Sequence, residues 1–564
     1  MLAFLSSEVV LGILSQLSRL FFLFVFLTIH VQCFAKQAIR LEELTLEQKI
    51  GQLFIIPACQ LRGEDHLEDL KRLIEKGMVG GIILKQGTAQ GQRDLIEKLQ
   101  ALSFLPLLCV QDAEWGVAMR LEDVVSFPRN LTLGAVQDLS LLDRLGQEIG
   151  RQCLFVGAHL NLAPVVDVNC NPKNPIIHMR SFGEDPSQVA ERGKRIMRGI
   201  QSMGVMACAK HFPGHGDTSV DSHVDLPLIT HDRERLHKVE LFPFQALIQA
   251  GVKAVMTAHL YVEALTEEIL QPATFSRRIV TDLLQKELGF QGLVITDALN
   301  MKALTKHYSS EQIAIQAFLA GHDLLLYGDH IAPLIDDILR IDVPQAFAAL
   351  KNAVEKGDIA EEEIDRRVRK ILCAKKELGL FGMAESQEMN LETAVRDGKA
   401  MHLKRRLFEE AITLVRNSGI LPLHDQKIAL IQWGESPCFK KAVQEACEAD
   451  LLLLSDLFLF EKLQHYPCAI LSLSGGTVPP QNFKLGQEEI ALLAQLSECG
   501  TSIIAAVFGT PYSLASLPLF DAIVMAYENE MEAQEAAAKV IFGQLSPRGR
   551  LPVSCESLHQ KLFN

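Results

Sequence analysis

The sequence predicts an α/β protein in which a (β/α)₈ barrel is followed by a smaller α/β sandwich domain. Eight short apolar runs alternate with helical patterns between residues 52 and 328. A second series of apolar runs and helices begins near residue 407. The chain has 564 residues, which is too many for one ordinary hydrophobic core, so we expect two domains.

The runs of the first series are continuously apolar rather than alternating. This is typical of parallel strands whose sheet is covered by helices on both faces, and eight strand–helix units match a closed barrel. An open doubly wound sheet is the alternative, but no GxGxxG turn follows the first run, which weakens it. The eight runs are 52–58, 79–85, 106–112, 160–168, 205–212, 252–260, 292–299 and 322–328.

Polar residues stand at the C-terminal ends of four of these runs. In a barrel of parallel strands, all these ends open on one face, which is the face that carries active sites. Polar residues commonly end strands without any functional role, which would account for one or two of these residues but less easily for five. We therefore expect five side chains to converge there: Asp112, Lys210, His211, His259 and Asp297.

We expect the barrel to span residues 40–385, a connector to span 386–406 and the second domain to span 407–564. Late in the barrel, apolar residues at helical spacing predict an amphipathic helix at 360–380, whose charged face we assign to solvent. The strands expected in the second domain are 427–433, 450–455, 468–475, 501–509 and 521–527.

Composition excludes some classes of protein. Hydrophobic residues make up 48% of the chain and charged residues 22%, which is typical of a globular protein. The formal net charge is -14. A nucleic-acid-binding protein would carry a clustered basic surface, so we expect no nucleic-acid partner.

The N-terminus predicts export. Arg19 precedes an apolar run at 20–27, and Cys33-Phe34-Ala35 resembles a small-x-small cleavage site. These features predict a signal peptide at 1–35 and a periplasmic or cell-envelope location. The alternative is an uncleaved anchor helix at 11–31, which would be the only membrane attachment.

The twelve cysteines follow no metal-binding or disulfide spacing. Cys109 and Cys208, for example, stand among apolar residues, so we interpret such cysteines as small buried hydrophobes. Unpaired cysteines are less common in an oxidising compartment, which leaves a cytoplasmic location as the alternative.

The segment KHFPGHGDTSVDSH, residues 210–223, is rich in His, Asp and Gly. A metal site made from His211, His215, Asp217 and His223 is one interpretation. However, HxxxH suits a metal best on a helix, and Pro213-Gly214 prevent a helix there. We expect no metal and no cofactor, and local hydrogen bonds from His215 and Asp217 that hold the shape of the loop.

Several motifs carry a resemblance to a known family. KHFPGHGDTSVDSHVDLP, at 210–227, closely resembles the signature loop of bacterial β-N-acetylglucosaminidases (β-hexosaminidases) in glycoside hydrolase family 3. VITDALNM, at 294–301, resembles the nucleophile segment of that family. RSFGEDP at 180–186 and APVVDV at 163–168 occur in the family's order. Two further segments resemble the start and the end of the family's C-terminal sandwich domain: AITLVRNSGILPL at 411–423 and PRGRLPVS at 547–554.

The resemblance implies catalytic residues. It places the nucleophile at Asp297, where a carboxylate at the end of a barrel strand could stabilise an oxocarbenium-like transition state. A helix N-cap is the structural alternative for Asp297. The resemblance also implies that His223, paired with Asp221, is the acid/base, because imidazole titrates near neutral pH and a carboxylate fixes its tautomer. Gly214 and Gly216 would let this loop move. Capping of a surface turn is the alternative for Asp221 and His223.

The resemblance further implies five sugar-binding residues. Carboxylates flanked by Arg or Lys donors suit the hydroxyl groups of a terminal pyranose. A salt bridge to Glu184 or Asp185 is the alternative for Arg180, and a plain ion pair at the barrel mouth is the alternative for Lys210. The five residues are Asp112, Arg120, Arg180, Lys210 and His211.

One motif departs from the family. Where many relatives have Asp-Gln-Glu-Gly-Gly, this chain reads DAEWG from Asp112, so Trp115 replaces a glycine. A Trp here would either stack on a sugar or fill space between the two domains.

Together, the motifs imply a retaining exo-β-N-acetylglucosaminidase acting on peptidoglycan-type fragments. A β-glucosidase-like relative is one alternative. A phosphorolytic relative is another, since a neutral histidine tolerates incoming phosphate. A non-catalytic wall-binding protein on the same fold is an alternative of another class.

Overall fold

The computed structural model of the chain describes residues 41–220, 225–266, 270–328, 335–382, 397–456, 458–475, 483 and 485–554. The expected signal peptide, at 1–35, lies outside the described residues, as do Asp221 and His223. None of the described helices is both long enough and apolar enough to cross a membrane. The ten cysteines within the described ranges are all free.

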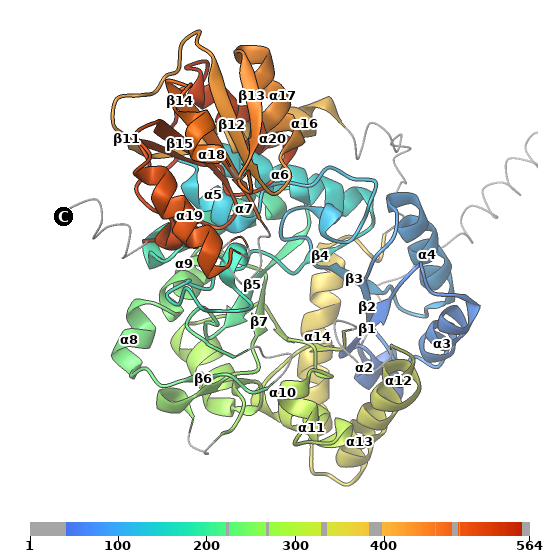
Figure 1. The fold of residues 1–564 in the computed structure, drawn as a ribbon. Coiled ribbons are helices and arrows are strands. Elements are labelled where there is room, and N and C mark those ends of the chain that lie inside the picture. The colour runs from blue at the N-terminus through green and yellow to red at the C-terminus, as the bar shows by residue number, and fades with distance from the viewer. Residues whose placement is uncertain are drawn as a thin grey trace, which may run out of the picture.

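Eight parallel strands form the barrel, and each lies within one of the eight apolar runs (Figure 1). The order in the sheet is β10-β1-β2-β3-β4-β5-β7-β9, and a bridge between Ile295 and Leu324 joins the last strand to the first. The fold prediction is therefore confirmed. The strands are β1 (Phe54–Ala58), β2 (Gly81–Leu84), β3 (Leu108–Gln111), β4 (Leu160–Asn161), β5 (Met206–Phe212), β7 (Ala254–Thr257), β9 (Leu293–Thr296) and β10 (Leu325–Leu326).

Helices surround this barrel, and their apolar faces pack on the outside of the strands. A short two-stranded sheet of β6 (Leu228–Ile229) and β8 (Tyr261–Val262) lies beside it. The helical segments are α2 (Leu46–Gly51), α3 (Glu64–Glu75), α4 (Ala89–Leu102), α5 (Asn130–Ala135), α6 (Ser140–Phe155), α7 (Pro186–Ser202), α8 (Arg233–Lys238), α9 (Leu241–Gln249), η6 (Arg278–Glu287), α10 (Lys302–Thr305), α11 (Ser310–Ala320), α12 (Ile335–Asp337), α13 (Val343–Glu355) and α14 (Glu361–Glu377).

The helix expected at 360–380 is α14, but its charged residues do not all face solvent. Arg367 is buried and donates hydrogen bonds to the carbonyl oxygens of His322 and Phe318. Lys375 is buried at the N-terminal end of the strands, where its Nζ donates to Gln52 Oε1 at 2.6 Å and to the carbonyl of Gly80 at 2.8 Å. Assigning the whole charged face to solvent was wrong, because these two side chains satisfy backbone carbonyls of the barrel.

A second sheet of six strands forms the C-terminal domain, in the order β11-β16-β15-β14-β12-β13. Five strands are parallel, and β11 pairs antiparallel with β16. Leu430 and Ile470 pack toward α17 and α20, whereas Ile431 and Leu471 pack toward α18 and α19, so helices cover both faces. The elements are α16 (Gly398–Ala411), β11 (Thr413–Asn417), β12 (Ile428–Trp433), α17 (Pro437–Ala446), β13 (Ala449–Leu453), α18 (Leu459–Leu463), β14 (Cys468–Ser474), α19 (Gln487–Ser497), β15 (Ser502–Phe508), β16 (Ala522–Met525) and α20 (Met531–Ile541).

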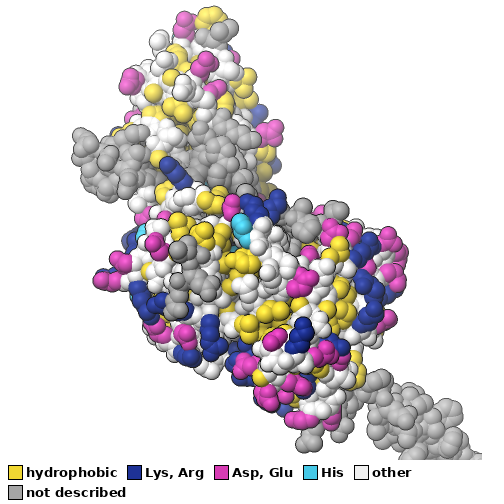
Figure 2. Space-filling view, turned by 90° about the horizontal axis from the view of Figure 1, so that it is seen from below, with side chains coloured by type: hydrophobic (Ala, Val, Ile, Leu, Met, Phe, Trp, Pro, Cys, Tyr) yellow, Lys and Arg dark blue, Asp and Glu magenta, His cyan; other side chains and the backbone are white. Residues whose placement is uncertain are grey.

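The C-terminal domain lies against the barrel on the side of α5, α6 and α7 (Figure 1). Glu528 joins the two, since its carboxylate accepts hydrogen bonds from the backbone N and Nη1 of Arg129 and from Thr132 Oγ1 at 2.6–3.0 Å. Tyr512 Oη accepts from Asn169 Nδ2 at 2.7 Å. The face shown in Figure 2 intersperses acidic and basic side chains.

Candidate active site

A cavity of about 260 Å³ lies at the C-terminal end of the barrel strands. Four of the five strand-end residues line it, as the sequence predicted: Asp112, Lys210, His211 and Asp297. Arg120 and Arg180 also line it, so every described residue that we expected to contact sugar faces one space. The remaining lining residues are Ile83, Glu114, Met119, Leu162, Ile176, His215, Met256, Ala298, Leu326 and Gly328.

His259 is the strand-end residue that does not line the cavity. It is fully buried, and its Nδ1 lies 2.7 Å from Thr274 Oγ1 while its Nε2 lies 3.0 Å from the carbonyl oxygen of Ala298. The expectation that His259 joins the converging group was therefore wrong. Its ring instead holds the backbone of the residue that follows Asp297.

Asp112 is held between two cations. Its Oδ2 accepts a hydrogen bond from Arg120 Nη2 at 2.6 Å, and its Oδ1 accepts one from Lys210 Nζ at 2.9 Å. Asp112 directly follows β3, and Lys210 lies within β5, so the barrel backbone sets the distance between them. A carboxylate fixed in this way presents its remaining lone pairs to the cavity in one orientation.

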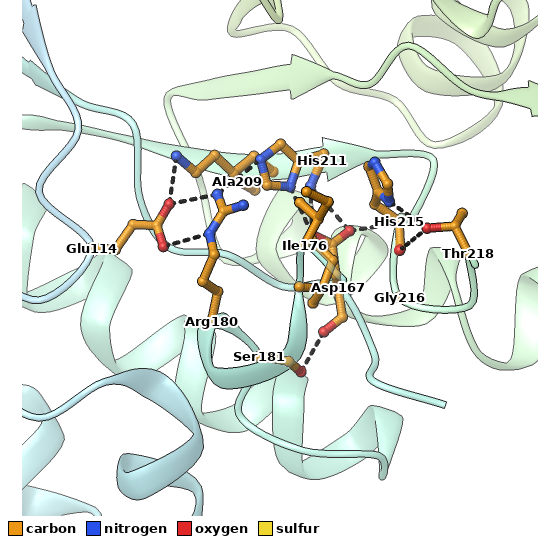
Figure 3. A network of polar contacts seen from close by, with 12 residues as sticks. Glu114, Asp167, Ile176, Arg180, Ser181, Ala209, His211, His215, Gly216 and Thr218 are labelled. Atoms are coloured by element: carbon orange, nitrogen blue, oxygen red, sulfur yellow. Dashed lines mark hydrogen bonds and ion pairs between the residues drawn. The ribbon is translucent and has the colours of Figure 1, made fainter. Parts of the chain in front are cut away.

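Glu114 is the partner of Arg180. Arg180 Nη2 and Nε donate to the two oxygens of Glu114 at 2.7 Å and 3.0 Å, and Lys210 Nζ lies 2.9 Å from Oε1 (Figure 3). The alternative that Arg180 pairs with Glu184 or Asp185 was wrong, because Asp185 instead caps α7. Sequence reasoning missed Glu114, although it is the third residue of the DAEWG motif.

This cluster keeps its charges at neutral pH. Burial alone would raise the pKa of Glu114, but the charges of Arg180 and Lys210 outweigh burial and hold that pKa at about 2. Burial likewise would lower the pKa of Lys210, but the charges of Asp112 and Glu114 raise it above its usual value. The cavity therefore has a wall of fixed, paired charges that is suited to hydrogen-bonding polar groups of a neutral ligand.

His211 is oriented by Asp167, which sequence reasoning also missed. Its Nδ1 lies 2.7 Å from Asp167 Oδ2, and its Nε2 lies 3.2 Å from Arg180 Nη2 (Figure 3). Burial would raise the pKa of Asp167, but His211 outweighs burial and holds the pKa below its usual value. Asp167 is fully buried inside the APVVDV motif, and an aspartate in such an apolar run was the available signal.

The loop after β5 is anchored to the same carboxylate. The backbone N of His215 donates to Asp167 Oδ1 at 2.7 Å, and His215 Nδ1 lies 2.8 Å from Thr218 Oγ1, which agrees with the expected local hydrogen bonds. Gly216 passes so close to Val168 that a Cβ would lie 1.8 Å from its carbonyl oxygen. Here glycine is needed for close packing as well as for any freedom of the loop.

The alternative metal set of His211, His215, Asp217 and His223 does not come together among its described members. His211 and His215 both bind Asp167 and line the cavity. Asp217 instead lies 2.6 Å from His231, outside the lining of the cavity. Burial lowers the pKa of His215 to about 4, so it is neutral at pH 7.

Asp297 follows β9 directly, and its side chain is partly exposed in the cavity. Its backbone N donates to the carbonyl of Thr257 at 3.0 Å, and its Oδ1 accepts from the backbone N of Ala298 at 2.7 Å. The helix that follows is α10, whose N-cap is Met301. Asp297 is therefore not the N-cap of that helix, and it lines the cavity instead.

Trp115 does not belong to the residues that line the cavity. The Arg129 guanidinium lies 5.0 Å from the centre of its ring, and Arg129 in turn binds Glu528 of the C-terminal domain. Of the two expected roles for Trp115, this geometry agrees with packing at the domain contact.

Comparison with known proteins gives the family of the chain. The N-terminal domain profile of glycosyl hydrolase family 3 matches residues 45–374, and its C-terminal domain profile matches residues 459–563. This chain belongs to glycosyl hydrolase family 3. The resemblance stated from the motifs is thereby confirmed.

Named relatives match over most of the chain. Beta-hexosaminidase A from Pseudoalteromonas piscicida is 30% identical over 86% of this chain and 91% of that protein. A beta-N-acetylglucosaminidase/beta-glucosidase from Cellulomonas fimi is 28% identical over 72% of each chain. A solved family 3 beta-N-acetylglucosaminidase from Paenibacillus sp. str. FPU-7 is 32% identical, covers 91% of this chain and 99% of its own, and superposes with a TM-score of 0.75.

Proposed function

We propose that this protein is a retaining exo-β-N-acetylglucosaminidase, which removes a terminal N-acetylglucosamine by double displacement. The observation that carries the proposal is the position of Asp297 in a cavity whose wall is made of Asp112, Lys210 and Arg180. A volume of about 260 Å³ suits one sugar ring rather than a long oligosaccharide. The names of the matched relatives support this choice of sugar.

Asp297 is the nucleophile in this proposal. Its carboxylate attacks the anomeric carbon of the bound sugar, and the bond to the leaving oxygen breaks as the glycosyl–enzyme ester forms. The hydrogen bond from Ala298 N holds one carboxylate oxygen in place. The paired charges of Asp112, Glu114, Lys210 and Arg180 fix the sugar hydroxyl groups, so that the anomeric carbon meets Asp297 in one orientation.

His223, oriented by Asp221, is the acid/base. Its imidazolium gives a proton to the leaving oxygen in the first step, and the neutral imidazole then takes a proton from the water that hydrolyses the ester. Support comes from the family motif and from the part of the same loop that the structure describes. That part is held at the cavity by the hydrogen bond between His215 N and Asp167.

The natural substrates proposed here are peptidoglycan fragments with a terminal N-acetylglucosamine, reached through export of the chain to the periplasm or cell envelope. The family resemblance and the signal-like segment at 1–35 support this assignment. An uncleaved N-terminal segment would keep the same enzyme attached to a membrane.

The test compares two aryl substrates. Aryl β-N-acetylglucosaminide and aryl β-glucoside are assayed with and without phosphate, and the anomer released first is identified by NMR. The wild type should prefer the N-acetylglucosaminide and release the β-anomer. Asp297→Asn should lose on the order of 10³-fold or more in turnover, and His223→Ala about 10²- to 10⁴-fold. Asp282→Asn, an exposed acid paired with Lys286 on η6, is the matched control and should behave like the wild type.

Three outcomes would contradict the proposal. Equal turnover by Asp297→Asn would remove the nucleophile. A preference for the glucoside would reassign the substrate. A glycosyl phosphate as the product in phosphate buffer would replace hydrolysis with phosphorolysis.

A further inference from the structure

Asp217, His231 and Glu240 form a second polar cluster, beside the cavity but not among the residues that line it. Asp217 lies in the loop after β5, His231 follows β6, and Glu240 directly precedes α9. One carboxylate or imidazole atom from each lies within 4.8 Å of the other two. The family motif includes only Asp217 of the three.

Glu240 is the unusual member of this cluster. Its side chain is 2% exposed, and its Oε1 accepts a hydrogen bond from Arg235 Nη2 at 3.3 Å. Its Oε2 is buried and has no hydrogen-bond partner among the described residues. A buried, unpaired carboxylate oxygen is costly, so this atom points to a cation.

The other two groups suit a metal as well. His231 Nε2 lies 2.6 Å from Asp217 Oδ2, and their side chains are 34% and 23% exposed, so an ion could enter from solvent and keep bound water. A Cβ added to Gly214 would lie only 2.8 Å from Glu240 Cβ, so the backbone of the loop passes close to the Glu240 side chain. Two carboxylates and one imidazole are a donor set that divalent transition metals accept.

We propose that Asp217, His231 and Glu240 bind one divalent metal ion of the Mn²⁺ or Zn²⁺ type. The two carboxylates and the Arg235 guanidinium together carry a net charge of −1. A bound divalent cation would bring the net charge of the cluster to +1. When the ion binds, His231 and Asp217 would each turn one ligand atom to the ion in place of their hydrogen bond to one another.

The ion would join two ends of one segment. Asp217 and His231 are 14 positions apart, and the residues between them include Asp221 and His223. A metal that holds both residues would fix the two ends of the segment that carries the proposed acid/base. This consequence for catalysis rests on the proposed function, whereas the binding of metal does not.

Metal binding is measured on the full chain without substrate. The protein is freed of metal with a chelator and titrated with Mn²⁺, with free Mn²⁺ followed by electron paramagnetic resonance. Mn²⁺ is the first probe because thiolates favour softer ions, and this chain has free cysteines that would bind Zn²⁺ elsewhere. We expect one saturable Mn²⁺ site per chain, from which an excess of Zn²⁺ displaces the Mn²⁺.

Variants locate the site. Glu240→Gln and His231→Gln should each weaken Mn²⁺ binding at least tenfold. Glu234→Gln is the matched control, because this exposed acid on α8 pairs with Lys238 and lies outside the cluster. If Glu240→Gln does not fold, His231→Gln and Asp217→Asn carry the test, since both side chains reach solvent.

The absence of a saturable Mn²⁺ site would overturn the proposal and leave His231 as a hydrogen-bond partner of Asp217. Unchanged affinity in His231→Gln or Asp217→Asn would also overturn it. Loss of glycosidase activity in Asp297→Asn with unchanged Mn²⁺ binding would show that the two proposals are independent.

Discussion

The Arg180 guanidinium and the Glu114 carboxylate form a two-point ion pair, and Lys210 contacts one of the same carboxylate oxygens. Glu114 is nearly inaccessible to solvent, with 1% of its side chain exposed. From this buried position it fixes two cations that border the cavity. Its effect on the reaction is one of positioning.

Glu114→Gln should weaken both sugar binding and folding. The variant keeps the shape of the side chain but leaves Arg180 and Lys210 without their shared charge, so the free energy of unfolding should fall by about 3–5 kcal/mol at pH 7. The KM for the aryl N-acetylglucosaminide should rise as well. Glu122→Gln, an exposed acid in the same segment, is the control.

The same variant has a pH signature. The pKa of Glu114 is about 2 in the fold and 4.5 in its ordinary state, so its contribution to stability is complete above about pH 4.5. That contribution is lost as the pH falls toward 2. Urea unfolding should therefore show a constant difference between wild type and Glu114→Gln at pH 5–7 and a smaller one at pH 3. A difference that grows on acidification would contradict the ion pair.

Asp167→Asn should impair catalysis more than folding. Asp167 accepts hydrogen bonds from the backbone N atoms of His211 and His215 and from His211 Nδ1. An amide supplies a donor where the site needs acceptors, at a cost of about 1–3 kcal/mol, which corresponds to roughly 10- to 100-fold in kcat/KM. Steady-state kinetics check this, and an unchanged kcat/KM in the variant would contradict a role of Asp167 in orienting His211.

Trp115→Gly should loosen the contact between the domains while leaving the chemistry nearly intact. The ring underlies Arg129, and a cation–π contact of this kind contributes about 0.5–2 kcal/mol. We expect a lower thermal midpoint and aryl-substrate turnover within about threefold of the wild type. Trp115→Phe, which keeps a ring beneath Arg129, should recover most of the midpoint. A large rise in the KM of Trp115→Gly would instead indicate that the ring contacts the sugar.

Lys375 should make stability rise with pH. Burial lowers its pKa to about 7, against 10.5 for an ordinary lysine, so the unfolded chain binds more protons between these values. The free energy of unfolding should increase by about 2 kcal/mol from pH 7 to pH 9 relative to Lys375→Met. Lys376→Met, an exposed neighbour on α14, is the control. Parallel pH dependence in wild type and Lys375→Met would show that Lys375 does not titrate in this range.

The barrel could be predicted because its strands are apolar on both faces, and a continuous apolar run is visible in one sequence. β11 was missed as a strand for the opposite reason. It is an edge strand with a single buried residue, Thr413, so its sequence carries little hydrophobic signal. β4 has only two residues. The polar network around Asp167 follows it, and the sequence alone does not show which residues that network joins.

Site residues could be predicted where a polar residue type stands at a strand end, as for Asp112, Lys210 and Asp297. The ion pairs between site residues could not be predicted. Arg180 binds Glu114 across 66 positions rather than Glu184 four positions away, because the barrel brings distant strand ends together. His259 has the same sequence context as Asp297, yet its ring turns toward Thr274, which only the packing of the fold decides.

Tyr512 reaches from the C-terminal domain to Asn169, two residues after Asp167, and Glu528 holds Arg129 and Thr132. A shortened enzyme ending at the barrel would thus leave the amide of Asn169, the guanidinium of Arg129 and the hydroxyl of Thr132 without these partners. A barrel-only version for immobilisation would therefore need new polar partners for these groups on the barrel surface before the C-terminal domain is removed.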